Sequence, residues 1–237
     1  MIISHKHRFI FIKTRKTAGT SIDIALSKVC GDEDIITDCG LPEDRELREV
    51  CGGKPTQNIY YDGKYTFRHW LEYIRKRKKI HFKEHLPAEK AKKMLGHDTW
   101  NRYFKFCVER NPWDKALSLY YWRTRDMDSP PSFINFLRSC KHKHLSNWYF
   151  YTINDELAVD YVAQYAELTK ELENIAQKLR FTKPVELPRA KGGYRSIKNK
   201  QQKLIGKNET NIIEKICHKE IKCFGYRLED SSMWSQK

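Results

Sequence analysis

One stretch, residues 9–29, constrains the fold of this chain more than any other. It begins with the apolar run FIFI, which follows Arg8 and is long enough for a buried strand but too short for a helix. A loop of cations and small residues follows over residues 13–19. Apolar side chains then recur at helical spacing, at Ile22, Ala25, Leu26 and Val29. The stretch therefore predicts a strand, a small-residue loop and a helix.

The loop has the composition of an anion site. Lys13, Arg15 and Lys16 supply positive charge, and a loop that enters a helix can direct backbone N–H groups and the helix dipole at one anion. It does not match the nucleotide P-loop, G-x-x-x-x-G-K-[ST], because it contains only Gly19 and its lysine precedes that glycine. We expect a phosphate or sulfate site without the Mg²⁺ geometry of an NTPase. An ordinary strand, turn and helix with a solvated basic turn explains the same residues equally well.

Length and composition favour one globular α/β domain over residues 1–237, with a central parallel sheet flanked by helices. The chain has 237 residues, of which 40% are hydrophobic, and it lacks an apolar run of about 18 residues that could span a bilayer. We expect a cytoplasmic protein with no transmembrane segment, in which residues 31–65 form a surface excursion. Seven scattered cysteines predict reduced thiols and no metal cluster. The formal charge of +15 favours an anionic partner: a nucleotide, nucleic acid, an acidic glycan or an anionic membrane.

A second informative block covers residues 103–122. It reads as a strand, then Asn111 as a helix cap and Pro112 in the first helical turn. Arg110 thus stands at the end of the strand, and Ser118 lies on the helix that follows. An arginine offers forked donors to a phosphate and a serine hydroxyl adds another donor. The alternative is an Arg–Asp pair beside the core with an incidental serine.

Two further regions bear on function. Residues 79–85 read as a strand that leads into a helix from Pro87 to Gly96, so His85 falls at a strand end, where ligands of open α/β sheets collect. His81 lies inside that strand and is expected to pack. Residues 66–79 read as a helix that ends in five cations, either a solvated terminus or a grip on an anionic acceptor.

The remainder of the chain reads as further α/β structure. Residues 148–152 and 158–162 are strand-like, residues 167–179 form a helix, and the last long helix begins at residues 208–210.

Several of these segments resemble the sulfotransferases, which take a sulfuryl group from 3′-phosphoadenosine-5′-phosphosulfate (PAPS). KTAGTS, residues 16–21, resembles their 5′-phosphosulfate loop, and RNPWDKALSLYY, residues 110–121, resembles their 3′-phosphate motif. Residues 83–88 are similar to the segment that supplies the acceptor-activating histidine in carbohydrate-type, family 2-like members. Residues 148–179 and 214–228, which include FGY, are similar to later family segments. The resemblance thus covers most of the chain and predicts the P-loop-NTPase-like fold of that family.

The resemblance implies a role for individual residues. His85 would be the general base, with His81 as the alternative, and the ordinary imidazole pKa near 6.5 suits that task. Lys16 would neutralise the leaving phosphate oxygen. The acceptor would be a hydroxyl of a carbohydrate or glycolipid, the product PAP, and no metal is expected. The implied donor-binding residues are Arg15, Lys16, Thr17, Ala18, Gly19, Thr20, Ser21, Arg110, Ser118 and, from a basic late loop, Arg195.

The chain also departs from the family pattern. Arg15 stands where a proline usually precedes the loop lysine, and Gln164 and Ala166 stand where relatives carry an arginine and a glutamate.

Two alternatives remain from other classes of protein. A nucleotide kinase would need a glycine-rich loop and an acidic Mg²⁺ ligand, neither of which is evident. A basic nucleic-acid-binding protein would explain the charge, although no zinc-finger, RNP or KH pattern occurs. The sequence does not indicate which hydroxyl is sulfated, nor the oligomeric state.

Overall fold

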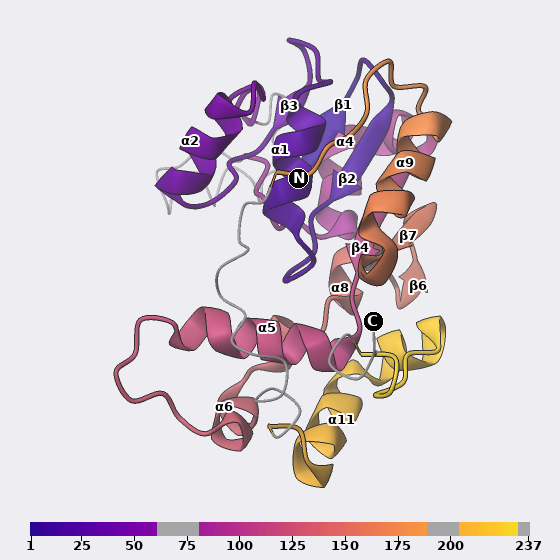
Figure 1. The fold of residues 1–237 in the computed structure, drawn as a ribbon. Coiled ribbons are helices and arrows are strands. Elements are labelled where there is room, and N and C mark those ends of the chain that lie inside the picture. The colour runs from indigo at the N-terminus through magenta and orange to yellow at the C-terminus, as the bar shows by residue number, and fades with distance from the viewer. Residues whose placement is uncertain (61–80, 189–203, 232–237) are drawn as a thin grey trace, which may run out of the picture.

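The structure, a computed structural model, describes residues 1–60, 81–188 and 204–231. It is an α/β fold built on a five-stranded mixed sheet of order β3-β1-β2-β4-β7 (Figure 1). Strands β2, β4 and β7 are parallel, as the sequence predicted for the centre, whereas β1 pairs antiparallel with both β2 and β3. The strands of this sheet are β1 Ile2–Ser4, β2 Phe9–Ile12, β3 Ile35–Ile36, β4 Phe104–Glu109 and β7 Tyr161–Gln164.

Helices cover both faces of the sheet, and alternate side chains of β2 show why. Phe9 and Phe11 pack with α1 (Gly19–Ser27) and α9 (Leu168–Lys178) on one face. Ile10 and Ile12 pack on the other face with α4 (Ala88–Arg102) and α8 (Trp148–Tyr151). All four side chains are fully buried. This alternation is the period of two that a strand covered on both sides requires.

A third layer of helices lies beyond the carboxyl ends of the parallel strands, at the bottom of Figure 1. It contains α5 (Pro112–Thr124), α6 (Phe133–Ser139), α7 (His142–Leu145) and α11 (Lys207–Phe224), which share an apolar cluster. The β2–α1 loop extends from the sheet towards this layer (Figure 1). The remaining described elements are α2 Pro42–Val50, the 3-10 turn η1 Tyr165–Glu167 and a hairpin of β5 Thr152–Ile153 and β6 Glu156–Leu157.

Several expected elements are confirmed. The Asn111 side chain accepts a hydrogen bond from the N–H of Trp113 at 3.1 Å, and Pro112 opens α5. Helix α9 and the start of α11 lie where the helical spacing predicts. Gly96, with φ +79°, breaks the helix that begins at Ala88, although a second helical segment continues to Arg102.

Other expectations were wrong. Residues 148–151 form the single-turn helix α8 because their aromatic side chains pack on α4 and the sheet; only Thr152 and Ile153 form a strand. Residues 81–87 contain no strand, only a bridge between His81 and Tyr60. The described part of the expected surface excursion contributes β3, which pairs with β1 at the sheet edge. Residues 66–79, the expected helix with its five cations, lie outside the described residues.

Candidate functional site

The β2–α1 loop has a backbone conformation that side chains rarely adopt. Lys16 has φ +60° and Ala18 has φ +59°, so two residues that are not glycine occupy the left-handed region. Such residues persist only where the surroundings hold them in place. Part of that support is local, because the Thr14 and Thr17 hydroxyls are 2.8 Å apart and the Thr14 hydroxyl also donates to the carbonyl of Val108 in β4. The loop therefore enters α1 with a fixed shape.

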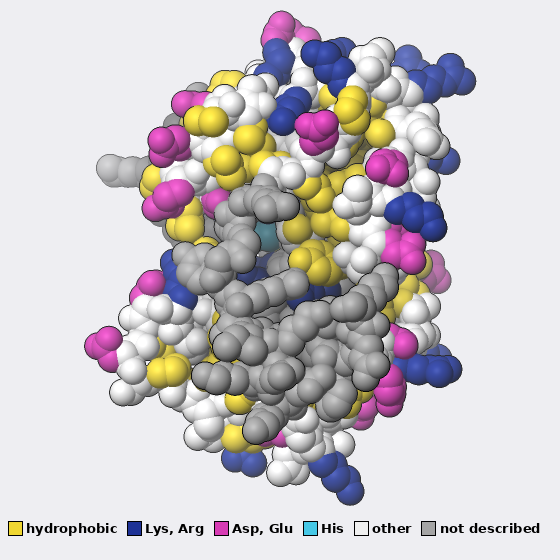
Figure 2. Space-filling model, in the orientation of Figure 1, with side chains coloured by type: hydrophobic (Ala, Val, Ile, Leu, Met, Phe, Trp, Pro, Cys, Tyr) yellow, Lys and Arg dark blue, Asp and Glu magenta, His cyan; other side chains and the backbone are white. Residues whose placement is uncertain are grey.

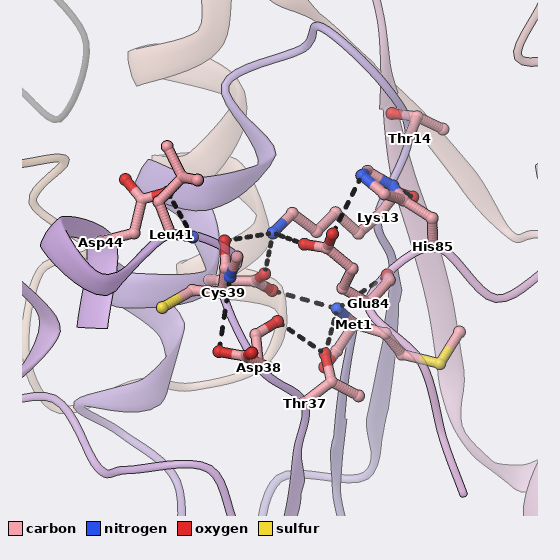
Figure 3. Close-up of polar contacts among 12 residues, drawn as sticks. Met1, Lys13, Thr14, Thr37, Asp38, Cys39, Leu41, Asp44, Glu84 and His85 are labelled. Atoms are coloured by element: carbon pink, nitrogen blue, oxygen red, sulfur yellow. Dashed lines mark hydrogen bonds and ion pairs between the residues drawn. The ribbon is translucent and has the colours of Figure 1, made fainter. Parts of the chain in front are cut away.

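Lys13 is a structural cation held by two carboxylates. Its ammonium lies 2.8 Å from a carboxylate oxygen of Asp23 in α1 and 3.0 Å from one of Glu84, and it is almost fully buried (Figure 3). Burial alone would lower the pKa of Lys13, but Asp23 and then Glu84 outweigh burial and raise it. Sequence reasoning missed Asp23 and Glu84. The signal for Asp23 was an acidic residue directly between Ile22 and Ile24.

Gly19 is required because the stem of Lys13 crosses it. A Cβ at this position would lie 2.8 Å from Cγ and 3.1 Å from Cε of Lys13. Since Asp23 and Glu84 hold the ammonium of Lys13, its stem has little room to move. The glycine of KTAGTS thus allows close packing between the loop and α1.

His85 lies directly beside this loop. Its Nδ1 is 2.9 Å from the carbonyl oxygen of Lys13, and 27% of its side chain is exposed. Burial lowers the pKa of His85 to about 4, although the neighbouring Glu84 carboxylate acts in the opposite direction. The imidazole is therefore neutral at pH 7. Its pKa lies below the ordinary value near 6.5 that the sequence analysis expected. Because Nδ1–H donates to the Lys13 carbonyl, Nε2 carries the lone pair that can accept a proton.

His81 occupies a different position from His85. It lies in the isolated bridge opposite Tyr60, and its ring centroid is 6.5 Å from that of Tyr60. Of the two histidines considered, His85 is the one that contacts the β2–α1 loop.

Arg110 brings the second block to the loop. It follows β4, is 7% exposed, and its Nη1 donates to the carbonyl oxygen of Lys16 at 3.4 Å. Its guanidinium carbon lies 4.3 Å from the ring centroid of Tyr165. Because β2 and β4 are parallel, with Ile12 opposite Cys107, both segments leave the sheet at the same edge. Ser118 is partly buried on α5.

The two loop cations Arg15 and Lys16 each pack against an aromatic ring. Nζ of Lys16 lies 4.7 Å from the centroid of Trp122 in α5, and the guanidinium of Arg15 lies 5.1 Å from that of Phe150. Cation–π contacts of this kind hold a positive group in place without neutralising it. Sequence reasoning assigned no role to either ring.

Near the middle of the face drawn in Figure 2, a histidine and Lys or Arg side chains are visible at the bottom of a hollow.

The other expected donor-binding residues fall into three groups. Thr17 is buried and its hydroxyl is engaged within the loop, which leaves its backbone N–H as the group that an anion can use. Thr20 and Ser21 are partly buried in the first turn of α1, whose N–H groups lack acceptors within the helix. Arg195 lies outside the described residues.

Comparison with known proteins shows which family the chain belongs to. A family model described as "Sulfotransferase family" matches residues 1–227, nearly the whole chain. The chain belongs to the sulfotransferase family. This sulfotransferase is also similar to an uncharacterized protein of Archaeoglobus fulgidus, with 30% identity over 98 residues, which are 40% of this chain and 82% of the archaeal one. No solved structure gives a significant match.

The structure also places Gln164 and Ala166, the two positions at which the resemblance implies other residues. The side-chain oxygen of Gln164, at the end of β7, accepts a hydrogen bond from the Tyr226 hydroxyl at 2.6 Å. Gln164 thus links the sheet to the segment after α11. Ala166 is exposed in η1.

Among the described residues, no helix combines the length and apolar character needed to cross a membrane. The same residues contain no group of three or more His, Cys, Asp or Glu side chains placed to hold a metal ion.

Proposed function

We propose that this sulfotransferase uses PAPS as its donor and transfers the sulfuryl group to a hydroxyl of a carbohydrate or glycolipid, with His85 as general base. The observation that carries the proposal is the contact between Arg110 and the Lys16 carbonyl, which joins residues 94 positions apart. It places the two segments that resemble the 5′-phosphosulfate and 3′-phosphate motifs side by side. A donor with phosphate groups at both positions needs that juxtaposition.

The residues present fit such a donor. The β2–α1 loop combines a fixed left-handed backbone with the first turn of α1, a combination that binds phosphate or sulfate groups. We assign the 5′-phosphosulfate to residues 16–21, with Arg15 at the edge, and the 3′-phosphate to Arg110 and Ser118. The planar, always charged guanidinium of Arg110 suits a phosphate that ADP lacks. Arg195 stays a proposed contact from the late loop.

Transfer requires an in-line arrangement and charge compensation at the leaving group. The acceptor oxygen forms a bond to sulfur as the bond between sulfur and the bridging phosphate oxygen breaks. The acceptor proton passes to Nε2 of His85, and the negative charge on the released PAP develops beside Lys16. Because the Nδ1–H of His85 is fixed on the Lys13 carbonyl, the imidazole enters the step in the tautomer that can accept a proton.

Charge and family resemblance support the acceptor class. The formal charge of +15 favours an acidic glycan or the headgroup of a glycolipid over a neutral small molecule. Part of the positive charge, that of Lys16 and Arg110, serves to bind the tri-anionic end of the donor.

Calorimetric titration with PAP, ADP and AMP, without Mg²⁺, tests the donor assignment. We expect PAP to bind more tightly than ADP, and Arg110→Ala to remove that preference. Arg123→Ala, an exposed arginine on α5, is the matched control and should bind PAP like the wild type. Equal affinities for PAP and ADP, or no PAP binding by folded wild type, would overturn the proposal and direct the work to nucleic acid, tested through its salt dependence.

A further inference from the structure

Asn147 holds the backbone of the β2–α1 loop from a distant part of the chain. Its side-chain oxygen accepts a hydrogen bond from the N–H of Arg15 at 3.0 Å, and its Nδ2 donates to the carbonyl oxygen of Arg15 at 3.1 Å. The two residues are 132 positions apart, and Asn147 is fully buried between α7 and α8. One side chain thus satisfies both backbone groups of the residue that precedes Lys16.

Asn147 is itself held by buried charges on two elements. Its Nδ2 also donates to Glu109 at the end of β4, at 3.2 Å, and its backbone N–H donates to Glu220 in α11, at 2.9 Å. Lys115 in α5 lies 2.9 Å from Glu109 and 3.7 Å from Glu220. These three charged side chains are at most 1% exposed. The Tyr151 hydroxyl donates to the other oxygen of Glu109 at 2.9 Å.

This arrangement matters because the loop conformation is strained. Lys16 and Ala18, directly after Arg15, have positive φ without being glycine. Strained backbone persists only where surrounding contacts fix it. The bonds from Asn147 fix the residue at which the strained stretch begins. An asparagine suits this place because its oxygen accepts from the N–H of Arg15, while its NH₂ group donates to both the Arg15 carbonyl and Glu109. An aspartate would offer two acceptors and would place a second carboxylate against Glu109.

We propose that Asn147 is a positioning residue of the donor site: it couples the buried charges of Glu109, Lys115 and Glu220 to the loop and so holds the loop ready for the phosphosulfate group. This inference rests on the proposed PAPS-dependent function. Asn147 does not contact the donor itself. Its loss lets Arg15 move and disperses the N–H groups of the loop, so its effect falls on donor affinity.

The test compares Asn147→Ala with Tyr151→Phe in PAP calorimetry and in urea unfolding. Both substitutions remove a hydrogen bond to Glu109, but only Asn147→Ala releases Arg15. We expect Asn147→Ala to weaken PAP binding by about tenfold or more, because two buried backbone groups lose their partners. Tyr151→Phe should bind PAP within about twofold of the wild type, since the loop contacts remain. Both variants should be less stable than the wild type.

The outcomes separate this inference from the function on which it rests. If Asn147→Ala and Tyr151→Phe bind PAP equally well, Asn147 has only a structural role and the inference is overturned. If the wild type does not bind PAP, the proposed function fails, and this inference fails with it. If Asn147→Ala does not fold, Asn147→Ser replaces it: a serine has one hydroxyl and cannot bridge both groups of Arg15, so the same loss of affinity is expected, and an unchanged affinity overturns the inference.

Discussion

Replacement of Lys115 by methionine tests whether buried charges organise the region behind the β2–α1 loop. Lys115 is 1% exposed and lies between Glu109 and Glu220, which are equally buried. Burial alone would lower the pKa of Lys115, but the Glu109 carboxylate, with smaller contributions that include Glu220, outweighs it and raises the pKa. Methionine has a similar length and no charge, so Lys115→Met leaves two buried carboxylates without their cation. Breaking a buried ion pair in this way lowers the free energy of unfolding by about 3–5 kcal/mol.

Urea unfolding at pH 7 measures this loss, and Lys219→Met provides the matched control. Lys219 in α11 also pairs with a carboxylate, Asp155 at 2.5 Å, but the two side chains are 39% and 58% exposed. A pair so exposed contributes little to stability, because water and salt screen the two charges. If Lys115→Met loses no more free energy of unfolding than Lys219→Met, the reasoning is refuted.

Three further predictions concern the loop and its histidine. His85 should remain neutral at pH 5.5 in NMR titration of the free protein, because burial lowers its pKa to about 4, whereas an ordinary histidine would be about 90% protonated there; substantial protonation of His85 would contradict this. Gly19→Ala should lower the free energy of unfolding by about 1 kcal/mol. Overpacking against Lys13 destabilises the fold by about 1–3 kcal/mol, whereas the higher helix propensity of alanine stabilises it by up to about 1 kcal/mol. A gain in stability would show that Lys13 moves freely. Asp23→Asn should cost about 3 kcal/mol in urea unfolding because it removes a buried partner of Lys13, and a loss below about 1 kcal/mol would place that pair among weak surface contacts.

Much of the central fold could be predicted because local pattern and tertiary environment agree there. The strand–loop–helix of residues 9–29 and the capped start of α5 carry signals of strand length, cap chemistry and helical spacing. The prediction of a strand at residues 148–152 failed because aromatic residues favour strands by propensity, while here their packing against α4 decides a helical turn. Strands β1 and β3 are short, and nothing in their spacing indicates antiparallel pairing.

The candidate site was predictable only in part. Residue types indicated Lys16, Arg110 and His85, but not which loop cation is structural. The ion pairs of Lys13 depend on Asp23 and on Glu84, far along the sequence, so only the three-dimensional packing identifies Lys13 as a buried scaffold residue. Likewise, no local pattern connects Asn147 to Arg15, because that contact joins residues from different layers of the fold.

Sulfuryl transfer itself tests the central claim most directly. The wild-type protein and His85→Gln would be incubated with PAPS and a panel of glycans and glycolipids, and mass spectrometry would quantify PAP and sulfated products together. The account predicts that the wild type releases PAP in equal amount to a product sulfated on a hydroxyl, and that His85→Gln binds PAP but forms little product. PAP release without any sulfated product, or equal product formation by His85→Gln, would contradict it.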